Sequence, residues 1–207
     1  MPIISAELLE VAARRHGVVT TAELVADGLT HHDVADLARR RALRRRHNGV
    51  HLLAGSPLTF EARCVAACLA DREAVVTGPA AGRLWGFEHV FRPNVPEVLV
   101  GHDRTPISRG VTLRRTNVLD DVDVVERPDS IRVASPPRAW FDSACHLPDE
   151  RFALLTDWVL AHHASIAELH RTVRRLDTRG RTGLARVRRV MSEREDWRRL
   201  REAHRAA

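Results

Sequence analysis

The spacing of apolar and polar positions predicts three short helices at the start of the chain. Each combines a capping residue with apolar positions at helical spacing, and the expected helices cover residues 5–15, 21–26 and 30–41. Thr20 stands three residues before Glu23, as in a capping box, and Thr30 stands in the same relation to Asp33. Gly28 closes the second helix in a tight turn. Two helices joined in this way are typical of a helix-turn-helix.

The apolar pattern then changes its period. The helical pattern ends near Arg41, and an alternating pattern typical of a β-strand begins at Leu43. An Asn-Gly pair at Asn48 is a turn signal, after which the alternating pattern returns as far as Leu53. A β-hairpin directly after a helix-turn-helix predicts a winged helix-turn-helix domain over residues 1–55.

The rest of the chain, residues 58–207, alternates between short apolar runs and helical patterns. Gly, Pro, Asn and Asp separate the apolar runs, which predict strands at 75–77, 98–100, 111–115, 122–125 and 131–133. Capping residues and helical spacing predict helices at 59–70, 79–85, 138–145, 150–162, from 165, and, after a break at 180–183, from Ser192 onward. The expected fold class is α+β, with an N-terminal winged helix-turn-helix, a mixed α/β second domain and a helical C-terminus.

Apart from histidine, arginine is the only basic residue in the chain. The 207 residues contain 33 arginines and no lysine, and the formal net charge is +6. The absence of lysine excludes a phosphate-loop lysine, a conventional kinase lysine and a Schiff base. Six arginines lie within residues 39–46, and a second basic set comprises Arg171, Arg174, Arg175, Arg179, Arg181, Arg186, Arg188 and Arg189. The second set could face DNA, an acidic protein surface or water alone.

Cysteine usage and hydropathy indicate the compartment. The three cysteines are an odd number, and the first residues lack the basic segment of a signal peptide, so we expect a reduced, intracellular protein. No apolar run approaches the roughly 20 residues that a membrane-spanning helix needs. We therefore expect a soluble cytoplasmic protein without membrane contact.

The basic segment coincides with the predicted recognition helix and wing, and this indicates binding to double-stranded DNA. In such a domain the recognition helix lies in the major groove, and the wing reaches phosphate or the minor groove. Arginine offers a fork of donors that suits phosphate or guanine. The expected DNA-binding residues are Thr30, His31, His32, Arg39, Arg40, Arg41, Arg44, Arg45, Arg46, His47 and Asn48. The alternatives are a solvated basic face, ordinary surface histidines, or a wing that docks on protein.

Other groups of reactive residues have structural explanations. Cys64 and Cys68 are four residues apart, as metal ligands can be, but no companion pair follows, and free cysteines are commonly core residues. Adjacent Cys145 and His146 do not place a thiolate beside a base. The acidic residues of the segment 120–123 could bind a cation, but a solvated turn between strands is the favoured interpretation. We expect no catalytic residue, no metal site and no cofactor.

Several segments also carry a resemblance to a known family. In the first domain they are GVVTTAEL at 17–24, GLT at 28–30, LRRR at 43–46 and NGVH at 48–51. In the second domain they are Thr77 with Ala80, Ala81 and residues 84–86, and residues 135–139 with Asp142. With these segments the chain resembles the AbiEi-family antitoxins of type IV toxin–antitoxin systems, of the actinobacterial type.

The resemblance implies a function. Antitoxins of this family pair with nucleotidyltransferase-like toxins, so we expect a protein that binds its own promoter as a transcriptional repressor and counteracts such a toxin. One alternative is an antitoxin that phosphorylates its toxin as an atypical serine kinase-like phosphotransferase. The sequence shows no lysine, glycine-rich phosphate loop or identifiable aspartate base for that reaction. The other alternative is a winged helix that serves as a protein-docking module.

Overall fold

The computed structural model describes residues 4–101, 110–177 and 182–206, with side chains as far as residue 195. The described residues form two compact units. The first comprises Met1–Val76, Asn94–Leu119 and Val124–Val133, and the second comprises Thr77–Pro93, Asp120–Asp123 and Ala134–Ala207. The protein is α+β, as expected, with two separate sheets. No helix in the described part of the chain combines the length and apolar character needed to cross a bilayer.

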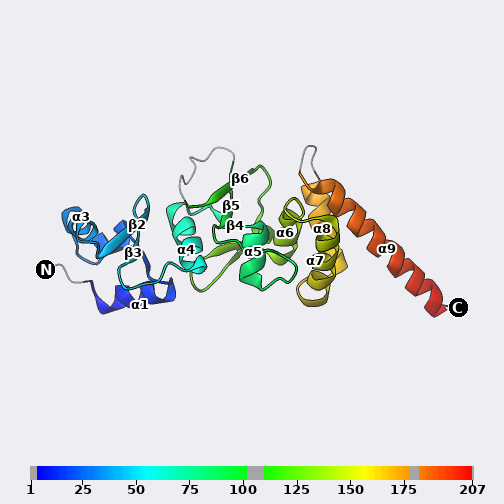
Figure 1. Ribbon diagram of the computed structural model, residues 1–207, viewed down its shortest axis with the longest axis horizontal. Helices are drawn as coiled ribbons and strands as arrows, with labels where there is room; N and C mark the ends of the chain where they lie inside the picture. The colour runs from blue at the N-terminus through cyan, green and yellow to red at the C-terminus, as the bar shows by residue number, and fades with distance from the viewer. Residues whose placement is uncertain (1–3, 102–109, 178–181, 207) are drawn as a thin grey trace. The chain divides into compact units, whose positions relative to one another are not determined.

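The first unit begins with the three predicted helices. They are α1 (Ala6–Arg14), α2 (Thr21–Ala26) and α3 (His31–Arg39), of which α1 and α3 are labelled in Figure 1. A short strand, β1 (Val18–Thr20), lies between α1 and α2 in the chain. Ser5 caps α1 by accepting a hydrogen bond from the amide of Leu8. Thr20 and Thr30 begin α2 and α3 with complete capping boxes. The predicted helix starts are therefore confirmed, whereas the three-residue strand β1 was not predicted.

The predicted hairpin is also confirmed. Strands β2 (Leu43–His47) and β3 (Val50–Leu53) are antiparallel, and β1 pairs with the other side of β3, which gives the order β1-β3-β2. Gly49 adopts a φ of 67° between the strands, a left-handed conformation that favours glycine. The element order α1-β1-α2-α3-β2-β3 is compatible with a winged helix-turn-helix, and we call the β2–β3 hairpin the wing.

The small sheet is covered on both faces. On one face, the three helices and the sheet share a core that consists of Leu8, Ala12, Val19, Leu24, Leu29, Val34, Leu37 and Leu43. Val18 and Leu52 pair across β1 and β3, are fully buried and lie outside that core. Helix α4 (Phe60–Ala70) packs against all three strands. We assign α4 to the face that carries Val18 and Leu52, because side chains of successive strand residues alternate between faces.

A five-stranded sheet follows in the first unit. Its strands are β4 (Val75–Val76), β5 (Glu97–Gly101), β6 (Thr112–Thr116), β7 (Val124–Glu126) and β8 (Arg132–Ala134), in the order β6-β5-β4-β8-β7. The pairs β5–β6 and β4–β8 are parallel, and β4–β5 is antiparallel, so the predicted mixed sheet is confirmed. The strand predicted at 122–125 begins two residues later than expected, because Asp121–Asp123 forms a 3-10 turn.

Side chains at the end of α1 contact the turn between β7 and β8. Arg15 donates from Nε to the hydroxyl of Ser130 over 2.9 Å, and His16 Nε2 lies 3.2 Å from a carboxylate oxygen of Asp129. Arg15 also pairs with Glu23 of the α2 capping box. These contacts connect the end of α1 with the larger sheet inside the first unit.

The second unit is helical. Its helices are α5 (Gly78–Trp85), α6 (Pro136–Ser143), α7 (Asp149–His162), α8 (Ile166–Leu176) and α9 (Leu184–Ala206). The capping box at Ser165 and Glu168 is confirmed at the start of α8. The helix predicted to begin at Ser192 is wrong in its start, since α9 already begins at Leu184. Val187, Val190 and Met191 are buried, so packing carries the helix through Ser192.

The break predicted at 180–183 lies partly outside the described residues. Gly183, which is described, has a φ of 88°, and a β-carbon there would come within 2.8 Å of the amide nitrogen of Cys145. This close approach to the end of α6 requires glycine just before α9.

The interpretation of residues 120–123 as a solvated turn is wrong for Asp123. Its side chain is buried, and a carboxylate oxygen accepts from Nη1 of the equally buried Arg138 over 2.9 Å. Arg138 Nε also donates to Asp142 over 2.7 Å, and Thr77 donates its hydroxyl to the same carboxylate over 2.8 Å. Arg175 of α8 pairs with Asp123 as well. We call these five residues the buried ion network.

Burial and pairing act in opposite directions on the Asp123 carboxyl. Burial alone would raise its pKa, but the hydrogen bond from Arg175 and the charge of Arg138 outweigh burial and hold the pKa below its ordinary value. The carboxylate therefore stays ionised and joins the 3-10 turn to α6 and α8.

We predict that Arg138→Met lowers the free energy of unfolding by about 3–5 kcal/mol, because removing one partner leaves the buried carboxylates of Asp123 and Asp142 without this cation. Urea titration followed by circular dichroism measures the change. Arg151→Met, which removes an exposed arginine of α7, is the control. A loss below about 1 kcal/mol in Arg138→Met, the level of a surface ion pair, would contradict the structural role given to this network.

Candidate nucleic-acid interface

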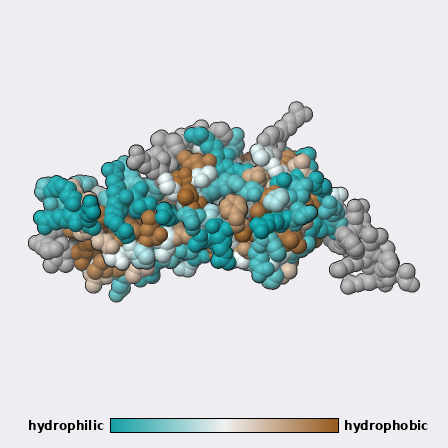
Figure 2. Space-filling view, viewed as in Figure 1, coloured by the Kyte–Doolittle hydropathy of each residue, from teal (hydrophilic) through white to brown (hydrophobic). Residues whose placement is uncertain are grey.

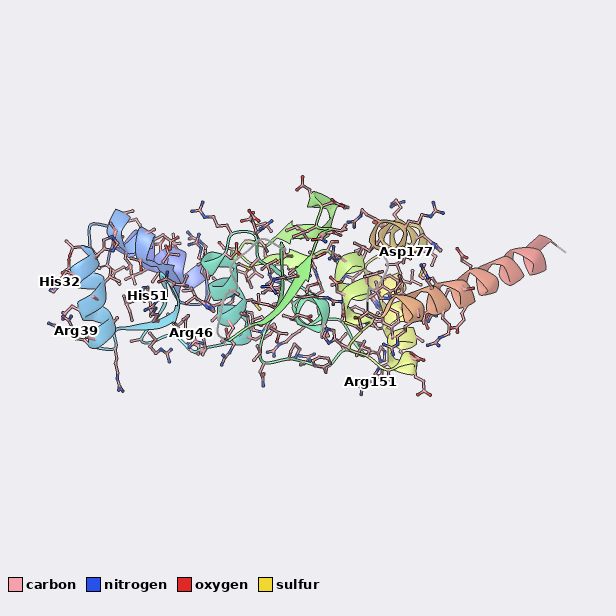
Figure 3. All side chains as sticks on the ribbon, turned by 90° about the horizontal axis from the view of Figure 1, so that it is seen from above. His32, Arg39, Arg46, His51, Arg151 and Asp177 are labelled. Atoms are coloured by element: carbon pink, nitrogen blue, oxygen red, sulfur yellow. The ribbon has the colours of Figure 1, made fainter. Side chains whose placement is uncertain are left out.

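The first turn of α3 carries three of the predicted contact residues. His31 and His32 are exposed there (Figure 3). Thr30 is also exposed, but its hydroxyl donates to Asp33 over 2.6 Å and accepts from the Asp33 amide over 3.1 Å. The hydrogen bonds from the Thr30 hydroxyl and amide hold the pKa of Asp33 below its ordinary value. The Asp33 carboxylate thus occupies the N-terminus of α3, and a phosphate contact by Thr30 would compete with the helix cap.

Three arginines lie at the opposite end of α3, all exposed. Arg39 and Arg40 each pair with Asp36, at 2.8 Å in both cases. Arg41 follows the helix with a φ of 61°, the left-handed conformation that ends many helices. Figure 3 shows Arg39 and His32 at opposite ends of the helix. Because α3 has nine residues, the two ends are roughly 13 Å apart.

The wing directs neighbouring arginines to opposite faces. Arg44 pairs across the hairpin with Leu52, and Arg45 pairs with His51. Cross-strand partners lie on the same face of a sheet, and successive residues alternate. Arg44 therefore lies on the α4 face with Leu52, and Arg45 lies on the face of the helical core. The sequence suggested a single basic cluster, whereas the structure divides it.

Hydrogen bonds fix the two sides of the wing in different ways. The guanidinium group of Arg45 donates to Asn48 Oδ1 over 3.0 Å and to the carbonyl oxygen of His47 over 3.4 Å. These two hydrogen bonds connect Arg45 to the tip of the hairpin. The guanidinium group of Arg44 donates to the carbonyl oxygen of Ser56, in the segment that leads into α4. Asn48 is therefore an exposed structural residue of the tip as well as a predicted contact.

A register shift separates Arg46 from the alternation. The pairing moves between Arg45 and His47, and Arg46 lies within this irregularity, half-buried. Partial burial lowers the pKa of Arg46 from its ordinary value, and the positive charges of Arg63 and Arg44 lower it further. Burial and the Arg46 charge lower the pKa of His47. Arg63, on α4, was not among the predicted residues.

His51 is a second residue that the sequence analysis did not single out. It is 6% exposed, its Nε2 lies 2.9 Å from the hydroxyl of Thr21, and its buried Nδ1 has no hydrogen-bond partner among the described residues. Burial lowers its pKa, and the nearby charge of Arg45 adds to this effect. The signal in the sequence was its position in the wing, opposite Arg45. His51 joins the wing to the start of α2.

The structure brings most of the predicted residues onto one subdomain. Helix α3 and strand β2 are in contact, so the arginines after α3 and those of the wing lie near one another. Figure 2 shows hydrophilic residues over α3 and the tip of the wing. Between Leu37 and Phe60 the sequence has no acidic residue. The result is a rigid basic surface with two histidines at the far end of α3.

The second basic set differs from this surface, because most of its described members have carboxylate partners. The ion pairs are Arg175 with Asp120 and Asp123, Arg186 and Arg189 with Asp149, and Arg188 with Asp177. Arg171 and Arg174 are exposed, and Arg179 and Arg181 lie outside the described residues. The paired members connect helices of the second unit through these ion pairs.

Two of the three cysteines are core residues, and Cys145 is half-buried. Cys64 and Cys68 are buried, and the Cys68 thiol donates to the carbonyl oxygen of Arg132 over 3.7 Å. Burial raises the pKa of Cys68 to about 12, so the thiol stays protonated. No cluster of three or more His, Cys, Asp and Glu side chains that could hold a metal ion occurs in the described part of the chain.

We predict that unfolding becomes easier as the pH falls below about 6.5, the ordinary pKa of histidine. The folded state lowers the pKa of His51, so the unfolded chain binds its proton more readily. This stabilisation is complete above pH 6.5 and is lost as the pH falls toward the folded-state pKa. The measurement is urea unfolding at pH 7.5 and pH 5.5.

In His51→Gln the difference between the two pH values should be smaller than in the wild type. It should not vanish, because His47 and His163 also have lowered pKa values. His31→Gln, at an exposed position of α3, is the control and should retain the wild-type difference. An equal difference in His51→Gln and the wild type would exclude His51 as the source.

Comparison with known proteins shows a distant structural likeness. No protein-family model matches the chain, and no curated protein matches it in sequence. Among solved structures, the crystal structure of the RV2827C protein from Mycobacterium tuberculosis is similar, with a TM-score of 0.48 and 15% sequence identity. The match covers 90% of this chain and 79% of that chain.

Proposed function

We propose that this protein is a cytoplasmic antitoxin that binds its own promoter through the winged helix-turn-helix, represses transcription, and counteracts a nucleotidyltransferase toxin. The observation that carries the DNA-binding part is the exposed arginine surface formed by the end of α3 and the wing. Arg41 and Arg45 are exposed there, and neither pairs with a carboxylate among the described residues.

The packing of the motif supports this proposal, because a DNA-reading helix must be held firmly. Val34 and Leu37 are buried on one face of α3, and Leu43 of the wing belongs to the same core. The opposite face of α3 remains available for a groove of DNA, with His31 and His32 in its first turn. Base contacts by these histidines would give sequence preference, and the arginines would fix the position of the domain on phosphate.

The charge balance also favours a polyanion as the ligand. Of the six arginines within residues 39–46, Arg39 and Arg40 share the single carboxylate of Asp36. Each phosphate that the remaining guanidinium groups neutralise would release counterions from DNA, so binding would depend steeply on salt.

The antitoxin part of the proposal has a different basis, the resemblance of the sequence to AbiEi-family antitoxins. The segments that carry it include Thr77, Arg138 and Asp142, which are members of the buried ion network. These residues are buried in the second unit, so their role is to hold the helices in place. The surface that would meet a toxin must therefore be formed by other residues.

For DNA binding, we predict that the double substitution Arg41→Ala/Arg45→Ala weakens binding to the upstream region and reduces its salt dependence. The slope of log affinity against log salt should fall by about 1.8 in magnitude, since each phosphate contact contributes about 0.9. Fluorescence anisotropy at several salt concentrations measures the slope.

Arg171→Ala/Arg174→Ala is a control with the same change of charge, at exposed positions of α8, and it should retain the wild-type slope. An Arg41/Arg45 variant that is folded and keeps the wild-type affinity and slope would exclude this surface. If the wild type forms a stable toxin complex but does not shift the upstream DNA, the wing is a protein-docking module instead.

For the antitoxin part, we predict that co-expression with a nucleotidyltransferase toxin encoded beside this protein restores growth that the toxin alone arrests. Continued arrest, with both proteins present and soluble, would contradict this part of the proposal. Intact-mass measurement of the toxin after incubation with this protein and Mg-ATP gives the mode of action. A gain of one phosphate indicates modification, and an unchanged mass excludes phosphorylation and leaves binding to the toxin or action at its target.

A further inference from the structure

Three arginines belong to the two elements that pack together where α4 meets the wing. Arg44 and Arg46 belong to β2, and Arg63 is the fourth residue of α4. The inference drawn from them rests on the proposed binding to DNA and concerns which residues contact it.

The backbone explains why these residues meet. Arg44 shares the sheet face of Leu52, which is the face that we assign to α4. Its guanidinium group holds the carbonyl oxygen of Ser56, three residues before the α4 cap at Thr59. The first turn of α4 is thereby kept beside the hairpin, and Arg63 lies in it.

The electrostatics of this group are unfavourable without a ligand. None of the three guanidinium groups pairs with a carboxylate among the described residues, in contrast to Arg175, Arg186 and Arg188. Partial burial lowers the pKa of Arg46, and the positive charges of Arg63 and Arg44 lower it further.

A bound anion would relieve this repulsion, and the wing indicates which anion. Arg45 lies on one face of the hairpin, and Arg44 lies on the other, which is the side of α4. The charge of Arg63, on α4, also acts on Arg46. A hairpin with guanidinium groups on both sides suits a groove of DNA that has phosphates along both walls. Figure 3 shows that Arg46, in the wing, lies away from the end of α3 that His32 marks.

We propose that Arg63, together with Arg44 and Arg46, forms a phosphodiester-binding site on the α4 side of the wing, separate from the contacts made by α3 and Arg45. Arginine suits this ligand because its planar fork donates two hydrogen bonds to one phosphate. The site binds the DNA backbone and not base edges, so it contributes affinity without sequence preference.

The test compares Arg63→Gln with the wild type as full-length proteins, by anisotropy on the upstream fragment and on an unrelated duplex. The magnitude of the salt slope should fall by about 0.9 on both duplexes. Over a fourfold rise in salt, the factor by which affinity falls should therefore be about three times smaller for the variant than for the wild type. The ratio of the two affinities should stay the same, because a phosphate contact weakens binding uniformly.

Two further variants make the test specific. Arg63→Lys keeps the charge and should retain most of the salt slope, and Arg151→Gln, on α7, should leave both affinity and slope unchanged. Urea unfolding of Arg63→Gln should show stability equal to or above that of the wild type, because a like-charge contact is removed. This result excludes misfolding as the cause of weaker binding.

The outcomes separate this inference from the proposed function. If Arg63→Gln keeps the wild-type slope while Arg41→Ala/Arg45→Ala loses it, the α4-side site is overturned and DNA binding stands. If Arg63→Gln changes the affinity ratio of the two duplexes, Arg63 contacts bases and the phosphate assignment is overturned. If the wild type binds neither duplex, both the site and the DNA-binding function fail.

Discussion

The ion pair between Arg138 and Asp123 is buried, and the second unit depends on it. An unpaired charge in the interior would be costly in free energy. Arg138 and Asp123 avoid this cost by pairing, and together with Asp142, Thr77 and Arg175 they connect a 3-10 turn, α5, α6 and α8. The same chemistry recurs at the surface of α9, where arginines pair with carboxylates of α7 and of the end of α8. In a chain without lysine, arginine must therefore fill structural and binding roles. An arginine that pairs with a carboxylate has a structural role, and an arginine without such a partner is a candidate for binding.

In the first unit, this distinction picks out two groups of arginines. Arg39 and Arg40 share a carboxylate, Arg41 and Arg45 have none, and the group of Arg44, Arg46 and Arg63 has none either, all among the described residues. Unpaired like charges close together reduce stability, so their presence on a well-packed scaffold favours an anionic ligand. The binding function remains our proposal, and the physical argument for it is this imbalance of charge on α3, the wing and the start of α4.

Local order in the first unit limits what its polar residues can do. Thr30 was a candidate for phosphate, but its hydroxyl is engaged with Asp33 in the cap that starts α3. Asn48 binds Arg45 at the tip of the wing, and His51 connects the wing to Thr21 at the start of α2. Residues that looked alike in the sequence thus divide into those that build the motif and those that project from it, of which His31, His32 and Arg41 are the clearest examples.

The sequence by itself determined the helix starts at Ser5, Thr20, Thr30 and Ser165, the hairpin at Asn48 and the α+β class, because these depend on hydrogen bonds and turns within a few residues. It did not reveal β1, the continuous α9 or the burial of Asp123, whose partner Arg175 is 52 residues away. Only the tertiary structure decided on which face of the wing Arg44 and Arg45 lie. It also placed the helix that carries Arg63 against the wing. Register and packing between distant elements set these positions, and a shift of one residue in a strand moves a side chain to the opposite face.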